Sequence, residues 1–382
     1  MTQLEHTLKQ RPPLYEVVMQ DPASGTQAFL VVDTLQGGLA GGGIRMTPTV
    51  SLGEVRRLAR AMTHKFSAIG VPMGGAKAGI VAAPGVPRGE ALDAFARLVE
   101  PLLRAFYVAG EDMGTTAADV ARIYRAAGCS WAEVVRRQTG VALPEAFDPT
   151  DFHGVNLEEQ LTGFGVAEAT EEACAVLGLD PKGARVAIQG FGTVGSVTAK
   201  NLSEKGFTIV AIADVEGAVH APGGLPVEAL LAAKDAYGTL DRARLDFPHQ
   251  TLDRDAWLDV EAEVLIPAAL ADTVHRGNVG RVRARLVVEG ANIPLTDEAE
   301  DVLFERGVAV VPDFIANAGA AGGFGLILTG QTEQAPEAVF AELGRRMRKV
   351  TRQVLARARR DGVSPRRAAV DLAEGRVAPE AG

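Results

Sequence analysis

Apolar residues along this chain follow two patterns that predict different backbone structures. Longer segments with apolar positions at helical spacing predict helices over 51–69, 88–104 and 336–373, and over a stretch that follows 161–165 and ends near 177. Strands that alternate with helices in the second half of the chain predict a doubly wound parallel sheet. Short apolar runs, which are typical of buried strands, occupy residues 15–19, 28–33, 185–188, 208–213, 264–267, 286–289 and 308–311.

The chain is too long for one hydrophobic core. Its 382 residues exceed the size at which a single core stops growing and chains divide into domains. Periodicity is weak over residues 124–156, which we interpret as the connection between two domains. The sequence therefore predicts an α/β protein with two domains, the second of them of the Rossmann type.

A glycine-rich motif follows the strand at 185–188 and opens a predicted helix. Gly190 permits a tight turn, Gly192 lets the backbone approach a pyrophosphate, and Gly195 lets helix and strand pack closely. The free amides at the helix N-terminus then face the anion. We expect every residue of the motif to bind a dinucleotide cofactor: Gly190, Phe191, Gly192, Thr193, Val194 and Gly195.

The following strands add further residues to the cofactor site and favour NAD over NADP. The first of them ends in Asp214, 19 residues after Gly195, where a carboxylate accepts hydrogen bonds from the adenosine ribose hydroxyls. Its negative charge would repel the 2′-phosphate of NADP. Other strand ends carry Ala268 and Asn292, at the edge where ligands of such sheets bind. Asn292 either hydrogen-bonds a ligand or caps the next turn.

Three charged residues of the first half are candidates for chemistry. Lys77 sits among glycines and small apolar residues, where partial desolvation would lower its pKa towards that of a working base. Asp112 follows a short strand, where it is either a catalytic carboxylate or a helix cap. Lys65 has the local pattern of a surface lysine that complements a helix C-terminus. The glycine-rich corner at 37–46 indicates either close backbone approach or a flexible loop.

Composition narrows the possible functions. The formal net charge of −9 argues against nonspecific binding to nucleic acid or anionic membranes, because both need a basic surface. With 47% hydrophobic and 23% charged residues, and without a long apolar run, we expect a soluble protein that no membrane anchors. Cys129 and Cys174 lack the spacing of a metal cluster, so we expect no metal. The first residues lack the apolar segment of a signal peptide, which favours a cytoplasmic location.

Several motifs, taken in order, resemble those of the Glu/Leu/Phe/Val amino-acid dehydrogenase family over residues 15 to 373. The resemblance implies a substrate-binding and catalytic domain over 1–150, completed by a C-terminal helix at 336–382, and a dinucleotide-binding domain over 151–335. The motifs are the glycine fingerprint, Gly42-Gly43-Ile44-Arg45, Met62-Thr63-His64-Lys65, Met73-Gly74-Gly75-Ala76-Lys77, Glu111-Asp112-Met113-Gly114-Thr115, Glu289-Gly290-Ala291-Asn292-Ile293-Pro294 and Pro312-Asp313-Phe314-Ile315-Ala316-Asn317-Ala318-Gly319.

The resemblance also implies a reaction, the reversible NAD(P)-dependent oxidative deamination of an L-amino acid to a 2-oxo acid and ammonia. By this resemblance Lys65 would pair with the substrate α-carboxylate, and Lys77 would polarise the carbonyl and activate the attacking water. Asp112 would exchange protons with the amino group. Thr162 would hold the nicotinamide carboxamide, with Asn292 near that ring. The chain would be a homo-oligomer whose size the sequence does not fix.

Two positions favour an apolar substrate. Where glutamate-type members carry a lysine, this chain has Gly41, next to Gly42, and where they carry a serine, counting along the chain gives Phe324. A buried substrate carboxylate without a partner is costly, which favours leucine, valine or phenylalanine. The stretch 214–217 is more similar to glutamate-type members, so a glutamate dehydrogenase is an alternative. A catalytically silent regulatory paralogue is another, although such a chain would not need the three charged residues.

Overall fold

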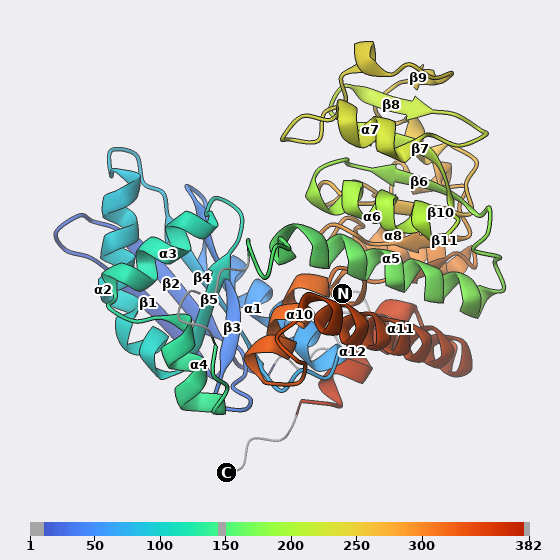
Figure 1. Cartoon of the computed structure of the whole chain (residues 1–382). Coiled ribbons are helices and arrows are strands. Elements are labelled where there is room, and N and C mark those ends of the chain that lie inside the picture. The colour runs from blue at the N-terminus through green and yellow to red at the C-terminus, as the bar shows by residue number, and fades with distance from the viewer. Residues whose placement is uncertain (1–10, 144–149, 378–382) are drawn as a thin grey trace. The chain divides into compact units, whose positions relative to one another are not determined.

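The computed structural model describes residues 11–143 and 150–377, and they form two compact units (Figure 1). The chain passes from the first unit to the second between residues 143 and 150, close to the predicted domain boundary. The first unit contains the described residues up to 143 together with 327–331 and Val377, and the second contains 150–326 and 332–376.

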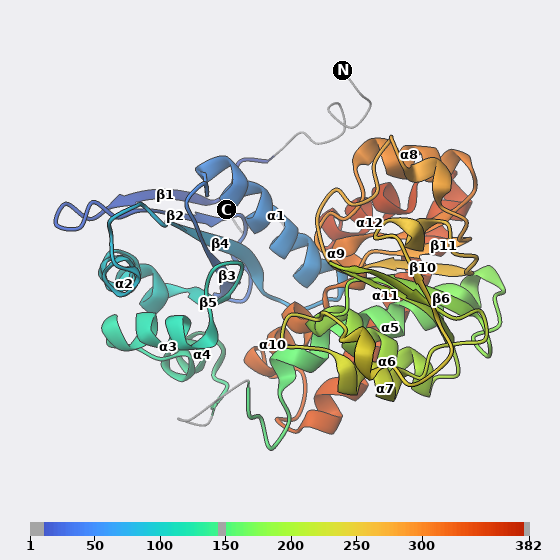
Figure 2. The ribbon, with the colours of Figure 1, turned by 90° about the horizontal axis from the view of Figure 1, so that it is seen from above.

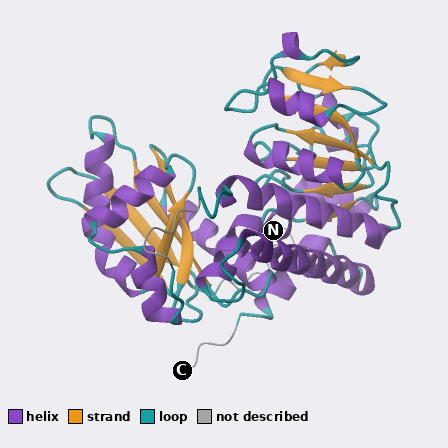
Figure 3. Cartoon of the chain, viewed as in Figure 1, coloured by secondary structure: helices purple, strands orange, loops and turns teal. Residues whose placement is uncertain are grey.

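The first unit is built on a mixed five-stranded sheet in the order β1-β2-β4-β3-β5 (Figure 3). β1 and β2 form an antiparallel hairpin, β2 is antiparallel to β4, and β3 lies parallel between β4 and β5. The hairpin matches the two apolar runs at 15–19 and 28–33. The strands are β1 Tyr15–Gln20, β2 Gln27–Val32, β3 Ala40–Thr47, β4 Gly74–Val81 and β5 Tyr107–Glu111.

Helices cover both faces of this sheet (Figure 2). On one face, Val55 and Ala59 of α1 pack against Phe29 and Val31 of β2. The opposite face packs against α2 and α3 and forms the larger core. Ser51 caps the first helix, as its position before a helical pattern predicts. The helices are α1 Leu52–Ala68, α2 Arg88–Ala105, α3 Ala117–Ala126 and α4 Trp131–Thr139.

The second unit has a seven-stranded sheet in the order β12-β11-β10-β6-β7-β8-β9. The strands from β12 to β7 are parallel, and β8 and β9 extend the sheet antiparallel. The chain continues from β6 to β7 on one side and to β10 on the other, so the strand order reverses between β6 and β10. Ligands of such sheets bind at the carboxyl ends of the strands beside this point. The strands are β6 Arg185–Gln189, β7 Thr208–Asp214, β8 Gly217–His220, β9 Gln250–Leu252, β10 Val264–Pro267, β11 Leu286–Val288 and β12 Ala309–Val311.

Helices lie on both faces of the second sheet, with α5 and α6 on one side and α8 on the other (Figure 2). This arrangement confirms the predicted doubly wound α/β fold. The helices are α5 Leu157–Leu177, α6 Thr193–Glu204, α7 Val227–Ala233, α8 Asp297–Glu305, α9 Asp313–Ala316, α10 Gly319–Leu328, α11 Pro336–Asp361 and α12 Pro365–Glu374, with short 3-10 turns η1 Arg242–Arg244, η2 Ala256–Leu258 and η3 Val279–Arg281.

The predicted C-terminal helix is two helices, and both belong to the second unit. α11 ends because Gly362 adopts a left-handed conformation with φ of 64°. α11 packs along α5, where Arg352 donates to the carboxylate of Glu172 at 2.6 Å. The sequence predicts that the segment 336–382 completes the first domain, whereas contacts within the chain group residues 332–376 with the second unit and Val377 with the first. Residues 378–382 of the segment lie outside the described residues.

The start of α5 also differs from the prediction. Residues 161–165 lie inside α5, which begins after its cap Asn156. The two glycines of this segment serve packing: a Cβ on Gly163 would lie 2.6 Å from the Cβ of Val197 on α6. The glycines therefore allow close helix packing inside α5, which begins earlier than the sequence pattern predicts.

The glycine-rich corner at 37–46 contains most of the buried strand β3. A Cβ on Gly42 would lie 1.7 Å from the carbonyl oxygen of Ala76 on the neighbouring strand. The glycines therefore allow close backbone approach, which is one of the two interpretations that the sequence leaves open, the other being a flexible loop. Among the helices of the described residues, none combines the length and apolar character that crossing a bilayer requires.

Candidate active site

The glycine loop of the second unit has the geometry that a dinucleotide pyrophosphate requires. Gly190 turns the chain with φ of 94°, and a Cβ on Gly195 would lie 2.0 Å from the Gly190 carbonyl oxygen. Helix α6 begins at Thr193 with Gly192 as its cap, so its first amides point out of the helix end. A Cβ on Gly192 would lie 3.9 Å from the nearest heavy atom. The Gly192 backbone is therefore approachable, and the loop fits an anionic ligand.

The predicted cofactor residues on other strands gather beside this loop. A Cβ on Gly190 would lie 3.0 Å from the Ala268 carbonyl carbon, and one on Gly290 would lie 3.0 Å from the Ala268 Cβ. Asn292 follows Gly290, and its side-chain oxygen accepts a hydrogen bond from Asn317 Nδ2 at 3.1 Å. Thr296 caps the helix that follows. The two predicted roles of Asn292, a ligand contact or a cap of the next turn, stay predictions.

Thr162 reaches the same edge from helix α5. Its neighbour Gly163 packs against α6, where a Cβ would lie 2.8 Å from the carbonyl oxygen of Val194 in the fingerprint. A Cβ on Gly319, at the start of α10, would lie 2.9 Å from the Thr162 Cα. The second unit thus brings α5, the glycine loop, β10 and β11 together at the carboxyl edge of its sheet.

Asp214 makes protein contacts that the sequence did not predict. Its Oδ1 accepts from the Glu216 amide at 2.9 Å and from Arg242 Nη2 at 2.6 Å. Its Oδ2 accepts from the Leu240 amide at 2.8 Å and from Arg242 Nη1 at 2.5 Å. These four bonds use the acceptor capacity of a carboxylate. They hold the pKa of Asp214 below its usual value despite burial. That Asp214 accepts hydrogen bonds from the ribose hydroxyls of the cofactor stays a prediction.

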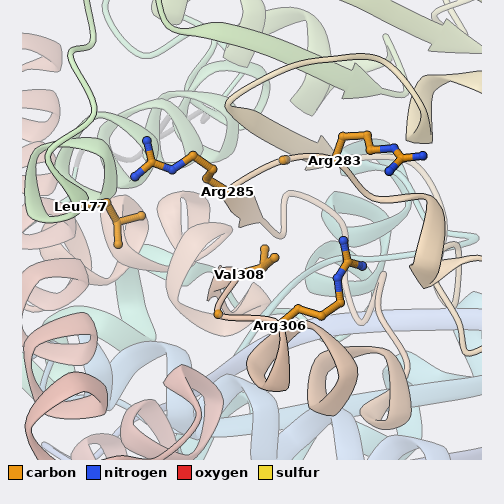
Figure 4. A pocket seen from close by; sticks show the side chains of 7 residues that line it. Leu177, Arg283, Arg285, Arg306 and Val308 are labelled. Carbon is orange, nitrogen blue, oxygen red and sulfur yellow. The ribbon is translucent and has the colours of Figure 1, made fainter.

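A separate cavity of about 240 Å³ lies where β11 and β12 begin, at the opposite edge of this sheet. Figure 4 shows that its three arginine side chains point in different directions. Arg306 donates to the carbonyl oxygens of Val279 and Val282 and is held by the fold. No predicted cofactor residue lines this cavity, whose residues are Leu177, Arg283, Ala284, Arg285, Arg306, Gly307 and Val308.

In the first unit, strand alternation places three charged side chains on the sheet face that α1 covers. Ala76 and Ala78 of β4 point into the opposite core, so Lys77 points towards α1. Arg45 of β3 and Asp112, which follows β5, lie on the same face as Lys77. Lys77 Nζ lies 3.2 Å from Asp112 Oδ2, and Arg45 Nε donates to that oxygen at 2.8 Å.

Glycine in β3 makes this cluster possible. A Cβ on Gly43 would lie 2.8 Å from the Asp112 Cβ. Asp112 does not cap α3, because Thr116 takes that position and forms a capping box with Asp119. The turn after β5 is held instead by Thr115, which accepts from the Asp112 amide at 3.0 Å. The Asp112 side chain is therefore free of a capping role and extends across β3 towards Lys77.

Burial and the two cations set the protonation states of the cluster. Only 7% of the Lys77 side chain is exposed, and burial lowers the pKa of Lys77 although Asp112 opposes this effect. Burial acts to raise the pKa of Asp112, but Lys77 and Arg45 outweigh it and hold the pKa below its usual value. A lysine that can lose its proton beside an ionised carboxylate is suited to proton transfer.

Arg45 is the residue whose role the sequence did not indicate. It stands in the family motif, but no role followed from its strand pattern. Its Nη1 also donates to Glu54 Oε1 at 2.6 Å, so it bridges two carboxylates. The available signal was its odd-numbered position in β3, which puts it on the face of Lys77 once β3 is placed beside β4.

Lys65 lies in the last turn of α1, the helix that packs on this face, and it is half-buried. The helix is fixed by Asp33, whose carboxylate accepts from Arg60 Nε at 2.7 Å and from Thr63 Oγ1 at 2.6 Å. Gly41 and Gly42 lie on β3. The half-buried Phe324 belongs to α10 in the second unit, so its predicted contact with the substrate stays a prediction.

A Rossmann-type unit with a dinucleotide loop, joined to a unit with a buried lysine–aspartate pair, defines a two-domain dehydrogenase. A family model described as Glutamate/Leucine/Phenylalanine/Valine dehydrogenase matches residues 154–381. A second, described as Glu/Leu/Phe/Val dehydrogenase, dimerisation domain, matches residues 15–128. The chain belongs to this family of oxidoreductases, which confirms the resemblance seen in its motifs.

Named relatives fall mostly on the glutamate side of the family. Glutamate dehydrogenase A2 of Halobacterium salinarum is 39% identical over 286 residues, which are 73% of this chain and 66% of that protein. Glutamate dehydrogenase of Thermotoga maritima is 36% identical over 289 residues, 74% of this chain and 67% of that protein. The aligned part of the chain thus spans about two thirds of the length of these relatives.

Two solved structures share the fold. The Leu-bound form of hetero-hexameric glutamate dehydrogenase from Thermus thermophilus has a TM-score of 0.76 at 29% identity, over 96% of this chain and 88% of that chain. L-tryptophan dehydrogenase from Nostoc punctiforme has a TM-score of 0.71 at 21% identity, over 98% of both chains, and supports the fold alone.

The cluster leads to a prediction about the pKa of Lys77. The carboxylate of Asp112 raises this pKa while burial lowers it, so Asp112→Asn should lower the pKa of Lys77 further. NMR titration of the Lys77 side-chain nitrogen measures the change. Asp119→Asn removes a carboxylate that pairs with Arg88 instead, and should leave Lys77 unchanged. An equal or higher pKa in Asp112→Asn would contradict the electrostatic account.

Proposed function

We propose that the protein catalyses the reversible oxidative deamination of an L-amino acid with an apolar side chain to the 2-oxo acid and ammonia. The observation that carries the proposal is the contact of Lys77 with Asp112 at 3.2 Å, buried on the sheet face that α1 covers. Family membership supports the same reaction.

The charged residues have complementary tasks in this proposal. Lys65 binds the α-carboxylate and orients Cα. The glycine loop would hold NAD, which would supply the acceptor for the hydride of Cα. Lys77, as an amine, takes a proton from the water that attacks the resulting iminium carbon. Asp112 takes a proton from the substrate ammonium before the hydride leaves and returns it to the nitrogen of the carbinolamine, which departs as ammonia. The proton of the carbinolamine hydroxyl passes to water as the carbonyl forms. Lys77 and Arg45 keep Asp112 ionised between turnovers.

The surroundings of Gly41 support an apolar substrate. A Cβ on Gly41 would lie 2.4 Å from Met73 Cε and 3.3 Å from Phe66 Cζ. The position at which glutamate-type members carry a lysine is thus surrounded by apolar atoms, which give a substrate carboxylate no partner. The names of the relatives favour a second candidate, glutamate.

Substrate class is predicted from these surroundings. With NAD at alkaline pH, NADH formation should be faster with leucine, valine or phenylalanine than with glutamate, by about tenfold or more in kcat/KM, because an unpaired buried carboxylate costs over about 1.4 kcal/mol. Absorbance at saturating NAD measures the rates. Turnover with glutamate alone would refute the apolar assignment and establish the second candidate.

Lys77→Ala serves as the control for the chemistry. It should lose at least about a thousandfold in kcat, while its NADH affinity stays unchanged because the glycine loop belongs to the other unit. Lys182→Ala, at a turn of the second unit, should keep full activity. Near-normal turnover in Lys77→Ala would refute the role of Lys77. An unmodified protein that binds NADH but turns over no amino acid would be the silent paralogue.

We further propose that NAD is the preferred cofactor. The argument is electrostatic: Arg242 is paired with Asp214 and also lies 3.5 Å from Glu216 Oε2. Two carboxylates therefore face one guanidinium, and the surplus negative charge at the end of β7 disfavours a 2′-phosphate. Relatives named NADP-specific belong to the same family, so the preference for NAD needs a direct test.

NADH should bind more tightly than NADPH, and Glu216→Gln should reduce the difference. Removing this exposed charge should strengthen NADPH binding roughly fivefold and leave NADH binding unchanged. Fluorescence titration of both cofactors measures the affinities. Glu228→Gln, an exposed carboxylate at the start of α7, is the matched control. Tighter binding of NADPH by the unmodified protein would refute the NAD assignment.

We also propose a homo-oligomer. The model that matches the first unit is described as a dimerisation domain, and β1 forms an edge of that sheet with Tyr15 and Val18 exposed. We expect a mass of at least two chains in size-exclusion chromatography with light scattering. A monomer at micromolar concentration would contradict the proposal. The cytoplasmic location stays a prediction that cell fractionation tests.

A further inference from the structure

Arg366, on helix α12, binds three buried carboxylates at once. Its Nη2 lies 2.7 Å from Glu289 Oε2, its Nε 2.5 Å from Glu300 Oε1, and its Nη1 3.0 Å from Asp313 Oδ1. Glu289 is fully buried, and Glu300 and Asp313 are each 8% exposed at the side chain. These residues come from four separate segments of the second unit, so Arg366 joins them through side-chain contacts alone.

The cluster has more carboxyl groups than cations. Burial raises the pKa of Glu289 and of Glu300, although Arg366 opposes this effect. Three carboxyl groups therefore depend on one guanidinium. Loss of the guanidinium would leave the remaining buried negative charge without any cation within the cluster, which is strongly unfavourable.

The cluster is connected directly to the loop that carries Asn292. Asp313 Oδ2 accepts a hydrogen bond from the Ile293 amide at 3.0 Å, and the Asp313 amide donates to Glu289 Oε2 at 2.8 Å. Ile293 has a φ of 49°, which is costly for a β-branched residue and persists only where neighbouring groups hold it. Arg366 binds the other oxygen of Asp313 and so fixes the carboxylate that holds Ile293.

A second set of bonds fixes the same loop from the other side. Asn317 Nδ2 donates to the Ala291 carbonyl oxygen at 3.0 Å and to Asn292 Oδ1 at 3.1 Å. Asn317 lies four residues after Asp313 and its amide donates to the Asp313 carbonyl at 2.8 Å. Both supports of the loop therefore start from the α9 segment that Arg366 holds.

We propose that Arg366 is a positioning residue that holds the loop 290–294 in the conformation that presents Asn292 to the nicotinamide half of the dinucleotide. The nature of the ligand rests on the proposed function, whereas the hold on the loop does not. Arg366 acts through Asp313 and Glu289 and does not itself reach the glycine loop, which binds the pyrophosphate at the end of β6. Its effect is therefore confined to the nicotinamide side.

The test uses Arg366→Lys and Asp313→Asn in the full chain. A lysine keeps the charge but cannot form three bonds in the geometry of the guanidinium fork. Asp313→Asn keeps the volume and removes the charged partner. Arg185→Lys is the matched control, because Arg185 forms a two-bond pair with Glu263 in the same unit at the amino end of β6. Circular dichroism and thermal melting identify any variant that does not fold.

Hydrogen exchange without dinucleotide is the first measurement. We expect exchange of the Ile293 amide to be about tenfold faster in Arg366→Lys and Asp313→Asn, and unchanged in Arg185→Lys. Exchange at Ile293 equal to that of the unmodified protein in both folded variants would overturn the proposal. This measurement does not depend on catalysis, so it separates failure of the proposal from failure of the proposed function.

Affinity for NADH and for ADP-ribose is the second measurement. ADP-ribose lacks the nicotinamide, so Arg366→Lys should bind NADH about tenfold more weakly and ADP-ribose as tightly as before. Equal weakening of both ligands would show a general structural role and would overturn the proposal. If the unmodified protein deaminates no amino acid while these contrasts hold, the proposed function fails and the positioning role stands.

Discussion

The buried contact of Lys77 with Asp112 is the interaction on which the chemistry of the first unit depends. With 7% of its side chain exposed, Lys77 has lost most of the hydration that stabilises an ammonium group. Asp112 at 3.2 Å returns part of that stabilisation, and Arg45 keeps Asp112 ionised. The ammonium is therefore less favoured than in water without being excluded. A group in this state can give up and take back a proton during one reaction cycle.

The contact depends in turn on a backbone that lacks side chains at particular positions. A Cβ on Gly43 would meet the Glu111 carbonyl oxygen at 2.3 Å as well as the Asp112 side chain, so any other residue would separate β3 from the end of β5. A Cβ on Gly75 would lie 2.1 Å from the Thr63 amide nitrogen and would push α1 away from β4. The glycines of β3 and β4 are thus a packing requirement that sets the distances between charges.

Much of this organisation can be predicted from the sequence, because apolar runs and glycine motifs depend on local chemistry. The strands, the dinucleotide loop, and the surroundings of Lys77 follow from residues close together in the chain. The partners of Asp214 do not, since Arg242 is 28 residues away and no local pattern identifies it. The unit to which α11 belongs is also unpredictable, because an amphipathic pattern shows that a helix face is buried but not which surface buries it. Arg45 gained a role only when β3 was placed beside β4.

The clusters around Lys77 and Arg366 differ in how their buried charges are paired, and this difference determines what each can do. Lys77 shares its one carboxylate, Asp112, with Arg45, so burial outweighs this partner and lowers the pKa of Lys77. Arg366 binds three buried carboxyl groups, and burial raises the pKa of Glu289 and Glu300 although Arg366 opposes it. A lysine with a lowered pKa is a base that can act on a substrate. A guanidinium that binds carboxyl groups from separate segments instead stabilises a fixed arrangement. The same physical rule therefore produces a reactive group in one unit and a rigid support in the other.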